Sequence, residues 1–159
     1  MAECRPMRET PLASLLIREH RRLDELFGRF LAAAHGDHAS GALEAIVGFD
    51  ESLRRHTAFE ERYVLPEPEG RKLLPTEEES DGTRVSRELR LEHVQVRELS
   101  AMIRQILEEG QDVEGARRLA PNLARRWDRH TTREEKELPR LEEEMGESVA
   151  AALREAGSA

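Results

Sequence analysis

The sequence has few cysteines, glycines, prolines and aromatic residues, and it has no long hydrophobic run. Cys4 is the only cysteine, so an internal disulfide framework is excluded. No segment approaches the roughly 20 apolar residues of a membrane span, and the N-terminus, MAECRPMRETP, lacks the apolar run of a signal peptide. We therefore expect a cytoplasmic protein, since a free thiol survives best in a reducing compartment.

The residues that are abundant favour helices. The chain has 159 residues, a length that fits one domain with a buried core. Charged residues make up 36% and apolar residues 38%, and this balance, with sparse glycine and proline, is typical of amphipathic helices rather than of a β-sandwich or barrel. The net charge of −8 argues against a nucleic-acid or anionic-membrane partner, because both require a basic face.

Apolar residues recur alternately three and four positions apart in four segments, which is the pattern of a helix seam in a left-handed bundle. Thr10 is a candidate N-cap for the first helix, with Pro11 at its first position, and Ser40 is a candidate N-cap for the second. Pro121 is expected to kink the fourth helix or to mark its start. The expected helices are residues 11–34, 41–65, 84–109 and 113–138.

The remaining segments complete the expected organisation of the chain. Residues 1–9 are expected to be disordered, residues 10–145 to form the helical domain, and residues 146–159 to form a C-terminal tail that can hold a short helix from Ser148 to Ala156. Residues 66–83 form a long acidic loop with three prolines. Such a loop is either functional or mobile, or it is a solvated connector.

Two stretches of the sequence occur twice. IREHRRLDEL at 17–26 aligns with RLEHVQVREL at 90–99, and H-T-x-x-E-E occurs at 56–61 and again at 130–135. The corresponding histidines are offset by 73 and 74 residues. The repeat predicts two helical hairpins joined by a long loop, which is an all-α, up-down-up-down antiparallel four-helix bundle.

The repeated stretches place polar residues on helix seams, where apolar side chains are expected. A His and a Glu four residues apart lie one above the other on a helix face, and counting from the predicted turns at ~1.5 Å per residue makes the seam histidines of each hairpin nearly level. One such pair alone often lies exposed on a helix, and one seam His is often a hydrogen-bonded core residue. Here six polar residues should converge at one depth of the bundle: His20, His56, Glu60, His93, His130 and Glu134.

Burial of these six groups without a partner would be unfavourable. A buried, unpaired carboxylate costs several kcal/mol, compared with the roughly 5–15 kcal/mol stability of a whole domain. Partial protonation and His–Glu hydrogen bonds would offset part of this cost, and a divalent metal would offset more. Six nitrogen and oxygen ligands exceed the needs of one tetrahedral zinc. Two metals bridged by the two carboxylates fit better, and donors without thiolate suit iron or manganese.

The order H…H-x-x-x-E…H…H-x-x-x-E, with the doubled Glu and the Leu-Pro that follows each pair, resembles the hemerythrin-like family of HHE cation-binding domains over residues 10–145. The resemblance implies two iron ions in a non-haem di-iron centre with an oxo or hydroxo bridge. It assigns bridging ligands to Glu60 and Glu134 and terminal ligands to the four histidines. It also implies binding or sensing of O2, peroxide or nitric oxide, or sensing of iron itself.

The third helix departs from the oxygen-carrying hemerythrins, which supply two histidines four residues apart there. Leu89 and Arg97 occupy the positions four residues either side of His93, so the expected ligand set is one short. This argues against reversible O2 carriage, and it leaves a position for solvent, a substrate or Tyr63, whose alternative role is that of a core aromatic. A di-iron oxidase or peroxidase is the alternative function, and an interaction module with structural metal is a third. No substrate pocket is readable, so we rank the binding protein first.

Residues next to the expected ligands have two possible roles. Four glutamates either hydrogen-bond the metal-bound imidazoles or remain solvated on the rim of the bundle: Glu19, Glu61, Glu92 and Glu135. Trp127 lies one turn from His130 and is expected mainly as a core residue that also shields the centre. No metal role is assigned to His35 or His38, because both lie in a predicted turn.

Overall fold

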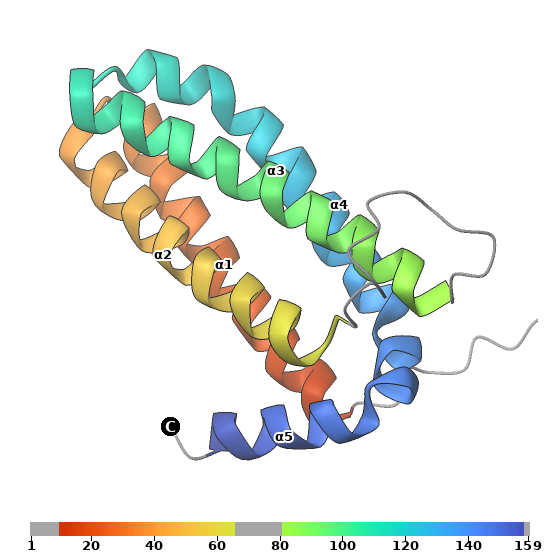
Figure 1. Ribbon diagram of the computed structural model, residues 1–159. Helices are drawn as coiled ribbons and strands as arrows, with labels where there is room; N and C mark the ends of the chain where they lie inside the picture. The colour runs from red at the N-terminus through yellow and green to blue at the C-terminus, as the bar shows by residue number, and fades with distance from the viewer. Residues whose placement is uncertain (1–9, 66–80, 158–159) are drawn as a thin grey trace, which may run out of the picture.

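The structure is a computed structural model that describes residues 10–65 and 81–157. This part of the chain is all-helical and contains no strand (Figure 1), so the predicted all-α fold class is confirmed. The predicted disorder of residues 1–9 and most of the predicted loop lie outside the described residues. The five helices are α1 (Pro11–His35), α2 (Ala39–Tyr63), α3 (Asp81–Gly110), α4 (Val113–Glu144) and α5 (Gly146–Gly157).

The first four helices pack side by side as a bundle (Figure 1). α1 packs against α2 and α4, and α3 packs against the same two helices. α5 turns back across one end of the bundle, where it contacts α1, α2 and α4. None of the helices in the described part of the chain is both long and apolar enough to cross a membrane.

Side-chain caps start three of the helices. Thr10 caps α1 as predicted, since its Oγ1 accepts a hydrogen bond from the Ala13 N–H at 3.1 Å. The prediction that Ser40 caps α2 was wrong: His38 is the cap, and its Nδ1 accepts from the Gly41 N–H at 3.0 Å. The turn before α2 contains Asp37 at a φ of 54°, so the chain enters the helix at Ala39 and Ser40 already lies inside it.

Tertiary packing moves several helix ends away from their predicted positions. α3 begins at Asp81, before the predicted Arg84, and there the Gly82 N–H donates to Glu144 Oε1 at 3.2 Å. α4 begins at Val113, so Pro121 lies inside it and does not mark its start. α4 also continues through Pro139 to Glu144, although it was expected to end at Leu138. Proline removes one backbone hydrogen bond, and buried residues on both sides of Pro139 hold the helix in place.

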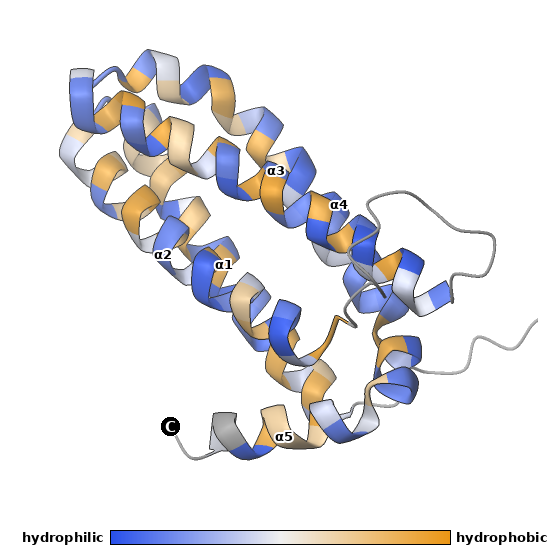
Figure 2. Cartoon of the chain, in the orientation of Figure 1, coloured by the Kyte–Doolittle hydropathy of each residue, from blue (hydrophilic) through white to orange (hydrophobic). Residues whose placement is uncertain are grey.

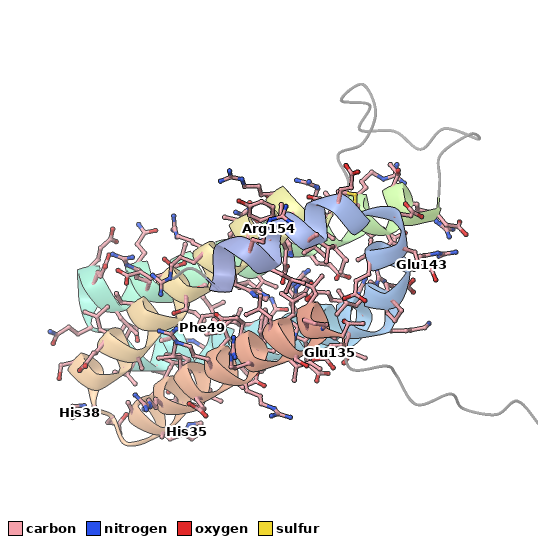
Figure 3. The ribbon with its side chains drawn as sticks, turned by 90° about the horizontal axis from the view of Figure 1, so that it is seen from below. His35, His38, Phe49, Glu135, Glu143 and Arg154 are labelled. Carbon is pink, nitrogen blue, oxygen red and sulfur yellow. The ribbon has the colours of Figure 1, made fainter. Side chains whose placement is uncertain are left out.

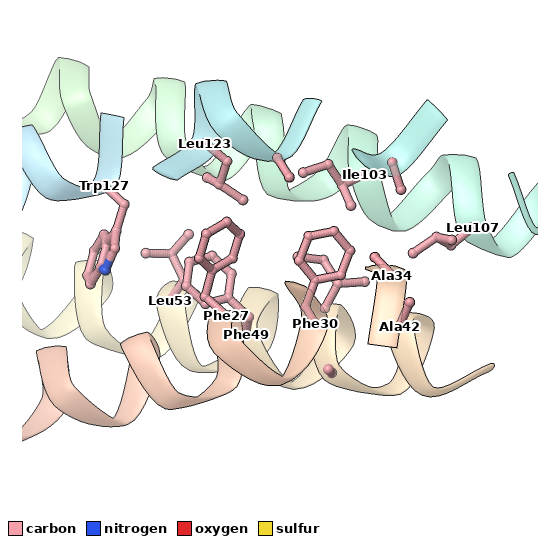
Figure 4. Packing of buried hydrophobic residues seen from close by; sticks show 14 of the residues in the cluster. Phe27, Phe30, Ala34, Ala42, Phe49, Leu53, Ile103, Leu107, Leu123 and Trp127 are labelled. Carbon is pink, nitrogen blue, oxygen red and sulfur yellow. The ribbon is translucent and has the colours of Figure 1, made fainter. Parts of the chain in front are cut away.

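The helices bury their apolar faces in two separate clusters. Figure 2 shows that hydrophobic and hydrophilic residues alternate along each helix. The larger cluster includes three phenylalanines, Trp127 and Leu123 (Figure 4). The smaller one is formed near the other ends of the four helices, and Val149 of α5 completes it. On each of the four bundle helices the buried residues between the two clusters are polar, so a polar layer interrupts the core.

Candidate metal centre

The polar layer is built from one histidine on each of the four bundle helices and one glutamate each on α2 and α4. These are the six residues that the sequence places on the seams, and the structure brings all of them together. Each is at most 3% exposed. Glu60 and Glu134 follow His56 and His130 by four residues, so each carboxylate lies one turn further along the same helix face.

Both carboxylates reach across to a neighbouring helix. Glu60 of α2 lies 2.7 Å from His56 Nε2 and 3.0 Å from His93 Nε2 of α3. Glu134 of α4 lies 3.0 Å from His20 Nε2 of α1 and 3.8 Å from His130 Nε2. The four helices are therefore connected through two glutamates at one depth.

These donors form two groups, and within each group all the ligand atoms lie within 4.8 Å of one another. The first group contains His20, His56, Glu60 and Glu134, and the second contains Glu60, His93 and His130. Glu60 belongs to both groups, and its Oε1 lies beside His56 whereas its Oε2 lies beside His93. The arrangement could hold a metal ion in either group.

The polar atoms of the layer lack other partners. All four Nε2 atoms and all four oxygens of Glu60 and Glu134 are buried without a hydrogen bond of proper geometry, although the contacts between them are short. Buried polar atoms in native proteins are almost always satisfied. Two donors bound at right angles to one metal at about 2.1 Å lie about 3.0 Å apart, which is close to three of the four observed separations, the exception being 3.8 Å between Glu134 and His130. The residues present therefore fit a metal.

Three of the four other imidazole nitrogens, the Nδ1 atoms, lie close to glutamates outside the two donor groups, whereas His56 Nδ1 has no hydrogen-bond partner among the described residues. Glu135 Oε1 lies 3.0 Å from His20 Nδ1, and Glu61 Oε1 lies 2.8 Å from His93 Nδ1. Glu92 Oε2 lies 3.5 Å from His130 Nδ1. A carboxylate in this position keeps the proton on Nδ1 and turns Nε2 toward the metal. Glu61, Glu92 and Glu135 thus each contact a histidine that is a candidate metal ligand. Glu19, the fourth glutamate next to an expected ligand, makes no such contact within the described residues.

Electrostatics in the layer raise the pKa of His20 and His93 and so favour their charged forms in the metal-free chain. Burial lowers the pKa of His20, but its contacts with Glu134 and Glu135 outweigh burial and raise it to about 9. Burial likewise lowers the pKa of His93, and Glu60 and Glu61 raise it to about 9. Burial raises the pKa of Glu60, yet the neighbouring His56 and His93 hold it well below its usual value.

The stability of the metal-free protein should therefore depend on pH. Protonated His20 and His93 stabilise the fold fully below their ordinary pKa of 6.5, and this contribution is lost as the pH rises through about 9. The stabilisation from ionised Glu60 is lost as the pH falls below 4.5, which is the ordinary pKa of a glutamate side chain. We expect the free energy of unfolding, measured with urea, to fall by on the order of a few kcal/mol between pH 6.5 and pH 9.5. His93→Gln should reduce this fall; an unchanged pH profile would contradict the prediction.

Trp127 closes the layer on the side of the larger apolar cluster. Its ring lies 5.5 Å from the ring of His20, 6.0 Å from that of His56 and 5.6 Å from that of His130, between ring centroids. Its Nε1–H donates to Asp24 Oδ1 at 2.8 Å. The position of Trp127 agrees with its predicted role as core and shield. Asp24 was not predicted, although it follows His20 by four residues and so shares its helix face.

Other residues considered from the sequence lie away from the layer. The Tyr63 ring packs 5.3 Å from that of Phe59 and under Arg62, against the smaller cluster, which is the core role. Leu89 is buried in that cluster, and Arg97 lies 3.7 Å from Glu61. The two turn histidines, His35 and His38, lie at the opposite end of the bundle from Glu143, whereas Glu135 lies beside α1 (Figure 3).

A helical bundle with a buried layer of histidines and glutamates defines a protein with a cation-binding core. The family model for the hemerythrin HHE cation-binding domain matches residues 12–138. The chain belongs to this family. No curated protein and no solved structure matches the chain.

Proposed function

We propose that the protein is a non-haem di-iron protein of the hemerythrin type that binds or senses O2, peroxide or nitric oxide, or iron itself. The observation that supports it is the pair of donor groups joined at Glu60. One iron would be held by His20, His56, Glu60 and Glu134, and the other by His93, His130 and Glu60. Nitrogen and oxygen donors without thiolate suit iron. The second bridging role that the family resemblance gives Glu134 stays a prediction.

We also infer that residues 10–145 form the functional domain and that its four helices run up-down-up-down. The contacts of α1 with α2 and α4, and of α3 with the same two helices, support this topology. The turn of a few residues between α1 and α2, and that between α3 and α4, also support it, because helices joined by short turns run antiparallel. In this topology the ligands of one hairpin face those of the other.

Bound iron would supply redox chemistry toward a small ligand, and the protein residues set its surroundings. The second donor group offers three protein ligands against four in the first, so we expect the small ligand at the second ion. Glu61 and Glu135 hold protons at Nδ1 of His93 and His20. Trp127 and the two apolar clusters exclude water, which strengthens every charge interaction inside.

The alternative function is a di-iron oxidase or peroxidase. A groove of ≈ 290 Å³ between α1 and α4 supports it, because the groove is lined by Glu135, which contacts His20. A substrate in this groove would lie one side chain from the centre. Turnover distinguishes the two functions: peroxide consumed over many cycles indicates an enzyme, and one equivalent bound and released indicates a binding protein.

Iron analysis of purified protein tests the proposal. We expect about two irons per chain after anaerobic loading with ferrous iron, and a visible absorption spectrum that changes when O2 is admitted. His56→Ala combined with His130→Ala removes one ligand from each group and should abolish both results. Protein that stays iron-free after supplementation would refute the proposal.

A further inference from the structure

A groove with a volume of ≈ 490 Å³ runs along the surface between α3 and α4. Cationic side chains make up half of its lining and outnumber the acidic ones. The cationic residues are Arg84, Arg129, Arg133, Lys136 and Arg140. The chain as a whole carries a net charge of −8. A cationic groove on an acidic protein concentrates anions locally, because narrow clefts focus the field of the charges that line them.

Four of the five cations come from a single face of α4. Arg129, Arg133, Lys136 and Arg140 are spaced four, three and four residues apart, so they form one stripe along the helix. The stripe continues for three turns beside α3. A ligand with one anionic group can thus contact several of these side chains at once.

The cations are held by ion pairs that an anion could replace. Arg133 Nη1 lies 2.7 Å from Glu88 Oε2, and the side chain of Glu88 is 46% exposed. Arg140 Nη2 lies 2.6 Å from Asp81 Oδ2, and both side chains are more than 40% exposed. Exposed ion pairs contribute little to stability, so an anion can replace their acidic partners. Lys136 is exposed and makes no ion pair with the part of the chain that the structure describes.

We propose that this α3–α4 groove is a binding site for a phosphate group, either the free ion or a monoester of a small molecule. Arginine presents a planar set of donors that matches phosphate oxygens in pairs. Arg133 and Arg140, with Lys136 between them, supply these contacts. The groove also holds Val85 and Thr132, which can contact the organic part of an ester.

The groove is connected to the candidate metal centre through Glu92, and this part of the inference rests on the proposed function. Glu92 is 7% exposed, and its Oε1 lies 3.3 Å from both Arg129 Nε and Arg133 Nη1. Its Oε2 lies 3.5 Å from His130 Nδ1. A bound phosphate competes for the two arginines, so they neutralise the charge of the Glu92 carboxylate less. His130 then becomes a stronger donor, so phosphate and metal should each raise the affinity for the other by the same factor.

Calorimetric titration of the full chain with inorganic phosphate and with glycerol 3-phosphate tests the site, at constant ionic strength. It is done on metal-loaded protein and on metal-free protein, in which phosphate cannot coordinate a metal. We expect saturable binding in both, and we expect Lys136→Gln with Arg140→Gln to weaken it by about tenfold or more. The matched control is Arg22→Gln with Arg29→Gln, which removes the same charge from exposed positions on α1 and should change affinity by less than about twofold. Tighter binding of the ester identifies an organic ligand, and equal binding identifies the free ion.

Three outcomes would overturn the site: no saturable binding, equal weakening in both variant pairs, or binding only when metal is present. Metal affinity that is unchanged by saturating phosphate would overturn the connection through Glu92. A chain that binds phosphate in the groove but takes up no iron would contradict the proposed function alone, so the two failures are distinguishable.

Discussion

Glu60→Gln is expected to reduce the iron content from about two per chain to less than one, whereas Glu134→Gln should retain about one. The reason is that Glu60 belongs to both donor groups, and Glu134 belongs to the first. Glutamine keeps the shape of the side chain but removes its charge, so the loss reports on ligation. The measurement is iron per chain after anaerobic loading and desalting.

Glu134 is a matched control, because it has the same residue type and the same position four residues after a histidine. Both side chains are at most 1% exposed, so a general effect of losing a buried charge would appear equally in both variants. Equal losses would therefore contradict the assignment of Glu60 as the one carboxylate shared by both groups. Two irons retained in Glu60→Gln would show that the structure assigns the shared ligand wrongly. Circular dichroism verifies that each variant remains helical.

Metal binding is expected to raise the melting temperature by roughly 10 °C. Metal at about 1,000 times its dissociation constant stabilises the native state by about 4 kcal/mol, and each kcal/mol shifts the melting temperature by about 2–4 °C for a chain of this size. Physically, the metal satisfies the buried nitrogen and oxygen atoms that otherwise have no hydrogen-bond partner. Differential scanning calorimetry with and without ferrous iron, under anaerobic conditions, measures the shift.

The double variant His56→Ala with His130→Ala serves as the control for this effect. It should melt at one temperature regardless of metal, because each donor group has lost a histidine. A shift that persists in the double variant would indicate that metal binds elsewhere on the acidic surface. No shift in the unaltered protein would contradict a metal role for the buried polar layer.

The fluorescence of Trp127 gives a second readout of iron binding, both for the glutamate variants and for the melting experiment. Trp127 is the only tryptophan, and its ring contacts those of three of the candidate ligands. Its fluorescence should therefore change when ferrous iron is added to the protein. A fluorescence change in Glu134→Gln that is absent from Glu60→Gln would agree with the expected iron contents.

Much of the helical pattern and the candidate site could be predicted from local spacing alone. A residue's position relative to its neighbours three and four places away decides which helix face it occupies. The alternation of three and four therefore predicted the buried faces, and His20, His56, His93 and His130 were placed on them. Counting residues from the turns gave their common depth, since the helical rise per residue is constant.

Contacts between helices could not be predicted in this way, because they depend on packing that local spacing does not contain. α4 passes through Pro139 because buried residues on both sides of it hold the helix in place. His38 rather than Ser40 caps α2 because a turn residue adopts a left-handed conformation. Asp24 meets Trp127 from a helix that lies 103 residues away in sequence.

The amino-acid sequence by itself determined which side chains are polar on each inner face, and hence that a polar layer exists. Only the tertiary structure decided that Glu60 is the carboxylate shared by both donor groups and that Glu92 lies between His130 and the arginines of α4. A helix period fixes the direction in which a side chain leaves its own backbone. The partner that it meets across the bundle depends on how all four helices pack together.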